Sequence, residues 1–298
     1  MGHGLMTIIS ILIAFTLCHF IRELRRLRRF EWLNEFIKRC GGLLGKLPGW
    51  NGPLGFLVIL GLPLVLAYFL NSLLYSLLGH IGEFLFAILM LIYTFGPRDL
   101  DVDVRKVIQT DDEADQKKAL EALLSGPIPE DKEDCQTAAI DMIFSKALKR
   151  WFGVIFWFAV LGIYGALLYR LATWMRYHKV GLQDEQKGLI VRLGEVLEWP
   201  VAQLMTLSLA IATDFDSVYR AWKSYHDERG HGLFDGNNDF MLTSARTIVM
   251  SGHAENDGYA DQLEGPMVTI KLSMDLVWRS LGVWATVLAI LLLVGVIA

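Results

Sequence analysis

Long apolar runs alternate with charged segments along the chain. Four runs, at 5–21, 52–78, 151–171 and 277–298, reach the length needed to cross a bilayer, about 20 residues with roughly 17 as the lower limit. A shorter run at 81–95 predicts a tight helical hairpin with the second run. A run at 199–215 fits a core helix, a re-entrant segment or a short span. The pattern predicts an all-α integral membrane protein with four to six membrane helices and cytoplasmic helical segments.

Composition agrees with this pattern. Hydrophobic residues make up 53% of the 298 residues and charged residues only 20%, whereas soluble domains have roughly 25% charged residues. The net charge of −4 gives no indication of a nucleic-acid partner. Cys18, Cys40 and Cys135 are far apart and form no CxxC pair, so neither a disulfide framework nor a thiolate metal site is indicated.

A basic segment, 22–46, follows the first apolar run. Its apolar residues recur at roughly helical spacing between the charges, which predicts an amphipathic helix on the membrane surface. Dense basic clusters beside a spanning helix stay cytoplasmic and attract anionic lipid headgroups. The residues expected at this lipid interface are Arg22, Arg25, Arg26, Arg28, Arg29, Lys38 and Arg39.

The chain divides into three regions by composition. We expect N-terminal membrane helices over 1–96, a cytoplasmic polar helical segment over 97–150, and a second membrane region over 151–298 with a polar segment at 216–276. Within the polar segment, the Gly126–Pro129 turn predicts two helices, at 111–124 and 134–150.

The side of the membrane is ambiguous after the fourth run. The excess of Lys and Arg places Arg170–Arg192 inside, whereas four preceding crossings would place it outside. A paired insertion of the fourth run with the 199–215 run would remove the conflict.

Local motifs give little indication of a catalytic, nucleotide-binding or metal site. Gly41–Leu47 resembles a phosphate loop, but Cys40 and Leu47 occupy positions that need Gly and Ser or Thr. His226, His231 and His253 lack metal-ligand spacing. We therefore expect no catalytic residue, no metal site and no cofactor. Asn71 lies deep enough in its run to make a hydrogen bond between helices.

The stretches Ala139–Arg170, Arg192–Leu204 and Ser217–His226 resemble the AmpE proteins, a family of bacterial inner-membrane proteins in the superfamily of the cobalamin-pathway enzyme CobD/CbiB. The resemblance covers most of the chain from about Cys135 onward, and the order of apolar runs before it. The residues that match the superfamily scaffold are Asp141, Phe156, Trp157, Gly162, Gly165, Tyr169, Arg170 and Pro200.

The enzyme branch of this superfamily carries an acid-rich motif before the fourth run. Aligned on Phe156-Trp157, this chain retains Asp141 as the first acid but has Ser145, Lys146 and Lys149 where the enzymes have Glu, Asn and Asp. Such a change removes the oxygen ligands that a magnesium–nucleotide complex prefers. The retained scaffold without these acids fits AmpE better than the synthase.

The resemblance implies a multi-pass protein of the bacterial inner membrane. It implies a non-catalytic, regulatory role in β-lactamase induction linked to cell-wall recycling, with a cytoplasmic muropeptide amidase as partner. The alternative is a CobD/CbiB-type adenosylcobinamide-phosphate synthase or another ATP-dependent amide-forming membrane enzyme. A small carrier is disfavoured, because the chain has few helices and no evident repeat between its halves.

Overall fold

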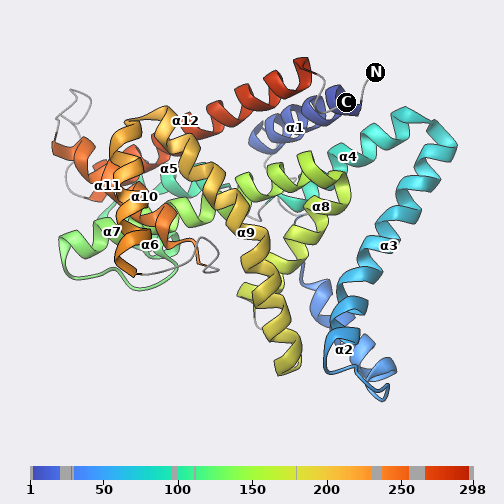
Figure 1. The fold of residues 1–298 in the computed structure, drawn as a ribbon. Coiled ribbons are helices and arrows are strands. Elements are labelled where there is room, and N and C mark those ends of the chain that lie inside the picture. Colours follow the sequence, from blue (N-terminus) through green and yellow to red (C-terminus); the bar gives the residue numbers. More distant parts are fainter. Residues whose placement is uncertain are drawn as a thin grey trace. The chain divides into compact units, whose positions relative to one another are not determined.

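The computed structural model describes residues 3–20, 28, 30–95, 99–110, 112–178, 180–229, 237–254 and 266–294. Over these residues the protein is all-α without strands, as the sequence predicts (Figure 1). Its helices are α1 (His3–Phe20), α2 (Trp32–Leu44), α3 (Pro53–Leu78), α4 (His80–Thr94), α5 (Leu100–Gln109), α6 (Glu113–Leu124), α7 (Lys132–Ala147), η2 (Leu148–Phe152, a π-helix), α8 (Gly153–Tyr177), α9 (Asp184–Ala212), α10 (Phe215–Arg229), α11 (Asp239–Ala254) and α12 (Pro266–Leu293).

Three described helical stretches are long and apolar enough to cross a membrane, namely Pro53–Leu78, Lys132–Tyr177 and Pro266–Leu291. Two shorter apolar helices, Met6–Cys18 and His80–Thr94, accompany them. The protein is therefore an all-α membrane protein, and its apolar helices lie in a lipid bilayer. Most of the 199–215 run belongs to α9, which begins at Asp184 and ends at Ala212, and whether it spans stays a prediction.

The fourth apolar run is not one continuous membrane helix, contrary to the sequence prediction. Gly162 has φ 63° and ψ −149°, which interrupts α8 between two helical arms, Gly153–Leu161 and Ile163–Tyr177. Residues with a side chain are essentially excluded from this backbone region, so the glycine permits the break. Hydropathy counts do not detect it, because glycine is also common inside intact membrane helices.

The two arms of α8 lie side by side. A Cβ added to Gly153 would come less than 3.0 Å from the ring of Tyr169, on the other arm. A Cβ added to Gly165 would come equally close to the carbonyl oxygen of Trp157. A straight helix would hold each of these pairs more than one turn apart. The fourth run is therefore a helical hairpin that reverses at Gly162.

The chain packs into two units. One unit comprises 1–97, 153–198 and 290–298, and the other comprises 98–152 and 199–289. Residues of the third expected region, 151–298, thus occur in both units. The expected division into 1–96, 97–150 and 151–298 stays a prediction.

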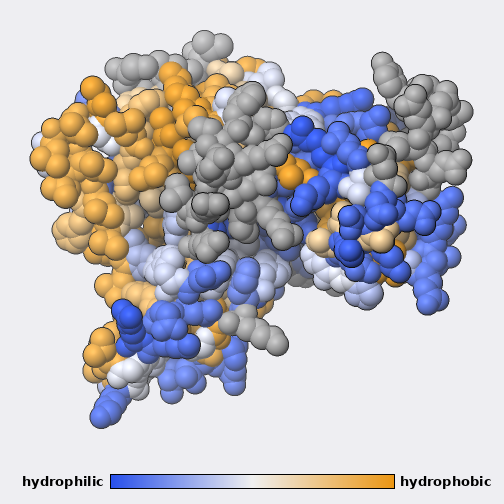
Figure 2. Space-filling model, turned by 180° about the vertical axis from the view of Figure 1, so that it is seen from behind, coloured by the Kyte–Doolittle hydropathy of each residue, from blue (hydrophilic) through white to orange (hydrophobic). Residues whose placement is uncertain are grey.

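The first unit is built from α1, α3, α4 and α8, which pack against one another. Its surface along α3 is strongly apolar, as the orange surface in Figure 2 shows. The exposed residues there include Leu57, Leu66, Phe69, Leu73 and Leu77. Only 28% of the most apolar window of this helix is buried in the protein, so lipid covers the remainder.

Two sequence predictions about the first unit are confirmed. Gly79 ends α3 and precedes α4, giving the predicted hairpin. Asn71 Nδ2 of α3 donates a hydrogen bond to Tyr164 Oη of α8, at 3.4 Å.

The second unit contains the polar helices α5, α6 and α7 together with α10 and α11. Helices α6 and α7 confirm the two predicted helices, and both begin at aspartates. Asp112 accepts a hydrogen bond from the Asp115 amide at 3.0 Å, and Asp131 accepts one from Glu133 at 2.9 Å. Such caps satisfy amides that have no partner inside the helix. Helix α5 was missed by the sequence analysis.

Candidate functional site

Asp141, the acid retained from the superfamily motif, lies on α7 and is ion-paired with Arg246 of α11. Arg246 Nε donates to Asp141 Oδ1 at 2.6 Å, and Arg246 Nη2 donates to Asp141 Oδ2. This two-pronged geometry is the strongest arrangement of a guanidinium on a carboxylate. The hydrogen bond to Asp141 raises the pKa of Arg246 above its usual value, so the arginine stays charged. Both carboxylate oxygens are therefore engaged by a cation of the protein itself.

Lys146, which stands at the position of the Asn in the enzyme-branch motif, contacts the end of a neighbouring helix. Lys146 Nζ donates to the carbonyl oxygen of Ala122 at 3.3 Å and to that of Leu123. These carbonyls lie in the last turn of α6, where the helix dipole favours a positive charge. Nearby, Arg150 Nη1 pairs with Asp103 Oδ2 at 3.2 Å, which links η2 to α5.

These positions do not fit a magnesium–nucleotide complex. Magnesium requires several oxygen ligands, usually including one or two carboxylates. Here Asp141 is held by Arg246, and Ser145, Lys146 and Lys149 supply one hydroxyl and two ammonium groups. Among the described residues, no group of three or more His, Cys, Asp or Glu side chains has metal-site geometry. Of the three histidines considered as ligands, His231 and the His253 side chain lie outside the described residues.

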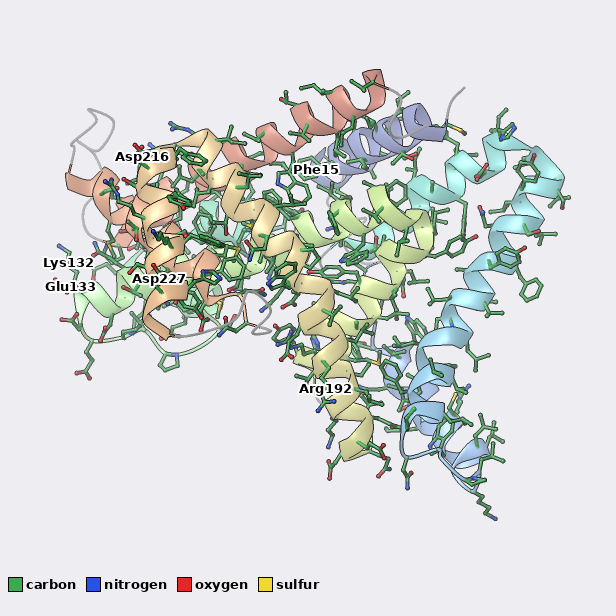
Figure 3. All side chains as sticks on the ribbon, viewed as in Figure 1. Phe15, Lys132, Glu133, Arg192, Asp216 and Asp227 are labelled. Atoms are coloured by element: carbon green, nitrogen blue, oxygen red, sulfur yellow. The ribbon has the colours of Figure 1, made fainter. Side chains whose placement is uncertain are left out.

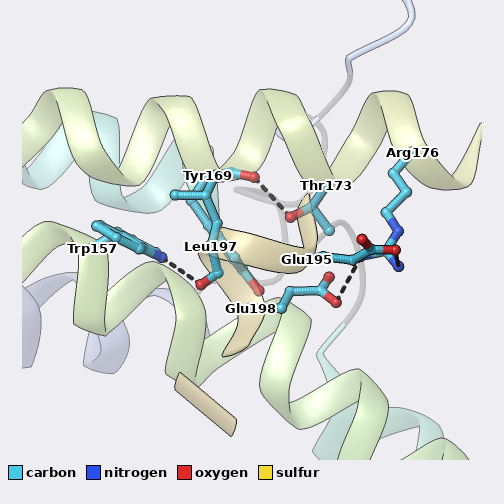
Figure 4. A network of polar contacts seen from close by, with 7 residues as sticks. All are labelled: Trp157, Tyr169, Thr173, Arg176, Glu195, Leu197 and Glu198. Atoms are coloured by element: carbon cyan, nitrogen blue, oxygen red, sulfur yellow. Dashed lines mark hydrogen bonds and ion pairs between the residues drawn. The ribbon is translucent and has the colours of Figure 1, made fainter. Parts of the chain in front are cut away.

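A second polar cluster joins the α8 hairpin to α9 inside the first unit (Figure 4). Trp157 Nε1 donates to the Leu197 carbonyl oxygen at 2.9 Å. Arg176 pairs with Glu198 at 3.2 Å and with Glu195 at 3.6 Å. Thr173 Oγ1 donates to the Tyr169 carbonyl oxygen at 2.7 Å.

The Arg176–Glu198 pair was not singled out from the sequence. The Glu198 side chain is 2% exposed and that of Arg176 19% exposed, so the pair is largely removed from water. Removing one partner of a buried pair is strongly destabilising, because the other charge stays buried. The available signal was Glu198 directly before Trp199-Pro200 in an otherwise apolar stretch. The cluster fixes the hairpin arm against α9 and offers no evident nucleophile.

The remaining scaffold residues are distributed between the two units. Gly162 and Gly165 form the reversal of α8, and Tyr169 is fully buried against Gly153. Arg170 is 5% exposed, with Cζ 5.6 Å from the centroid of the Phe30 ring, a cation–π arrangement. The rings of Phe156 and Trp157 meet edge to face at 5.0 Å. Asp141 and Pro200 belong to the second unit.

The basic segment is described only in part. Arg22, Arg25, Arg26 and Arg29 lie outside the described residues, and their contact with lipid stays a prediction. Arg28 is 2% exposed, so its side chain does not reach the headgroups as expected. Lys38 and Arg39 are exposed on α2, whose buried face carries Leu33, Ile37 and Cys40.

The chain is similar to a curated protein named "Cobalamin biosynthesis protein CobD" from Stutzerimonas stutzeri. The two are 26% identical over 251 residues, which cover 76% of this chain and 78% of the relative. No family model matches the chain, and no solved structure matches it. The similarity supports a relationship with the CobD/CbiB superfamily, and it does not indicate the AmpE family within it.

Proposed function

We propose that the protein is a regulatory protein of the bacterial inner membrane that uses a CobD/CbiB-type scaffold without catalysis. The observation that carries the proposal is how this chain uses two positions of the enzyme-branch motif, those of Asp141 and Lys146. Asp141 is paired through both oxygens with Arg246, and Lys146 binds the end of α6. A site that must gather magnesium and nucleotide phosphates cannot form there without breaking both contacts.

The regulatory role follows the resemblance to AmpE. The protein would modulate β-lactamase induction by presenting α5–α7 to a cytoplasmic partner, a muropeptide amidase. These helices suit this role, because α6 and α7 begin with exposed acidic turns that include Asp115, Glu133 and Asp134. Lys132 and Glu133 extend from the start of α7 (Figure 3).

A second candidate is a CobD/CbiB-type enzyme that joins an amine to a corrinoid carboxylate with ATP. The named relative favours this candidate better than the regulatory one, because the similarity covers most of both chains. The enzyme would need oxygen ligands other than Asp141. Of the acids at 111–115, Asp112 caps α6, and Asp115 forms an exposed pair with Lys118 at 2.9 Å.

Deletion of the gene separates the two candidates. Loss of the regulatory protein should change β-lactamase induction by a β-lactam and leave growth without cobalamin precursors unaltered. Loss of the enzyme should produce a cobalamin requirement and leave induction unaltered. The first result supports the regulatory proposal, and a cobalamin requirement alone overturns it.

Complementation with variants sharpens this experiment. Asp141→Asn keeps the size of the side chain but weakens the pair with Arg246. If the chain is regulatory, Asp141→Asn and Arg246→Gln should have similar, moderate effects on induction. If Asp141 serves an enzyme, Asp141→Asn should abolish turnover of ATP with corrinoid and amine, whereas Arg246→Gln should retain turnover.

A further inference from the structure

The end of α8, the connection after it and the start of α9 enclose a pocket of about 350 Å³ in the first unit. This volume lies in the range of small-molecule sites, about 300–1,000 Å³. Met175 and Arg176 come from α8, His178, Val180 and Leu182 from the connection, and Lys187, Ile190 and Val191 from α9. Neither the acid positions nor the resemblance to AmpE involves this pocket.

The charged and titratable side chains that line the pocket are all basic. They are Arg176, His178 and Lys187, and the lining contains no carboxylate. Lys187 is 54% exposed and pairs at 2.9 Å with Asp184, whose side chain is 98% exposed. Such an exposed pair is weak and leaves the ammonium two further N–H donors.

Arg176 and His178 are held in place by their neighbours. Glu195 and Glu198 each contact one terminal nitrogen of Arg176, and a guanidinium has five N–H donors in a rigid plane. His178 Nδ1 lies 2.9 Å from the Trp174 carbonyl oxygen, so Nδ1 carries a hydrogen. The ring also stacks on Trp174 with centroids 4.7 Å apart. Both side chains are thus positioned before a ligand arrives.

The other five lining residues are apolar. Met175, Leu182 and Ile190 are buried, whereas Val191 is 39% exposed. The apolar arm of α8 ends at Tyr177, so the pocket lies where a membrane helix meets the polar headgroup region. Arg192, next along α9 (Figure 3), adds a further positive charge to this region. A ligand that suits these walls carries both an anionic group and an apolar part.

We infer that this pocket binds the phosphate group of an anionic amphiphile. The phosphate lies on Lys187 and Arg176, and the apolar part lies along Ile190 and Val191. A phospholipid headgroup and a free phosphate ester share the chemistry of the anionic end. The membrane position and the apolar walls favour the lipid.

Lipid retention measured by native mass spectrometry tests the inference. The full chain in a non-ionic detergent is incubated with phosphatidylglycerol or, separately, with phosphatidylcholine. We expect preferential retention of phosphatidylglycerol, with about a fivefold lower affinity in Lys187→Gln. Lys118→Gln is the matched control, because Lys118 forms an equivalent exposed pair with Asp115, also at 2.9 Å. It should bind as the unaltered protein does.

Two further measurements identify the source of the phosphate. Val191→Ser should weaken retention of phosphatidylglycerol and leave binding of glycerol phosphate unaltered, if a lipid is the ligand. Glycerol phosphate that binds with the same dependence on Lys187, while the lipid does not, would assign a soluble phosphate ester. Equal retention of both lipids, with no effect of Lys187→Gln and no phosphate binding, would overturn the inference.

Discussion

At two glycine corners in the first unit the chain reverses with nearly the same glycine backbone conformation, but the surroundings differ. Gly79, between α3 and α4, has φ 60° and ψ −145°, and Gly162, inside α8, has φ 63° and ψ −149°. Each is followed three residues later by a second glycine, Gly82 or Gly165. A Cβ added to Gly82 would lie less than 3.0 Å from the Leu74 carbonyl oxygen, as one on Gly165 would from that of Trp157.

The helices that leave the two corners differ in burial. Near the first corner α3 exposes Leu73, Leu77 and Leu78 at 54%, 69% and 54%. At the second corner Gly153 and Tyr169 hold the arms together in the protein interior. At each corner a glycine with positive φ permits the reversal and a glycine three residues later permits the close approach. Residues further along the arms determine whether the hairpin is closed by protein or covered by lipid.

The largest effect should come from closing the space between the buried arms. Gly153→Ala places a methyl group against the fully buried Tyr169 ring, and overpacking of this kind costs about 3 kcal/mol. The thermal unfolding midpoint in detergent should fall clearly. Gly188→Ala on α9 is the control, because an added Cβ there meets no atom within 4 Å. An equal response of the two variants would show that the arms are not closely packed.

The two corner glycines should respond alike, and less strongly. An added Cβ meets nothing within 4 Å at either Gly79 or Gly162, so only the backbone conformation is penalised. We expect about 2 kcal/mol of destabilisation for Gly79→Ala and for Gly162→Ala. Gly61→Ala within α3, also without neighbours, should be neutral or slightly stabilising, because alanine favours helix. A Gly162→Ala variant as stable as Gly61→Ala would indicate a continuous α8.

The smallest effect should come from the hydrogen bond that joins α3 to the second corner. Asn71 Nδ2 donates to Tyr164 Oη, and the Tyr164 and Tyr68 rings are 6.3 Å apart. A double-mutant cycle of Asn71→Ala and Tyr164→Phe should give a coupling free energy of about 0.6 kcal/mol, the average for such bonds in membranes. A coupling indistinguishable from zero would mean that the two hairpins are held together by packing alone.

The sequence predicted one corner and missed the other. Gly79-His80 separates two apolar runs without any Lys or Arg, so a hairpin followed from the pattern. Gly162 lies within a single apolar run. A glycine there has the same sequence pattern whether it reverses the chain or only lets another helix approach closely. The G-x-x-G pair at 162–165 matches the pair at 79–82, but G-x-x-G also occurs at 42–45 and 52–55 without a reversal of this kind, so the pattern alone does not identify the corner.

The sequence could predict some residues of the candidate site but not which of them contact one another. Sequence comparison identified Asp141 and the lysines at 146 and 149. The partner of Asp141 could not be found, because Arg246 lies 105 residues away and no local pattern links them. The same holds for Arg176 and Glu198, whose pairing depends on α9 lying beside the second arm of α8.

From the reversal at Gly162 we also predict a smaller number of membrane crossings. The first arm, Gly153–Leu161, is about 13 Å long at ~1.5 Å per residue, less than half of the ~30 Å hydrocarbon core. Helix α8 continues α7 and η2 without a break, but Lys149 and Arg150 precede its apolar part. We therefore predict a loop that enters and leaves through the same leaflet and adds no crossing. We then expect the Arg170–Arg192 stretch, in which Lys and Arg outnumber Asp and Glu, in the cytoplasm without any pairing with 199–215. Asp184→Cys should accordingly react with a membrane-impermeant maleimide only in inside-out vesicles.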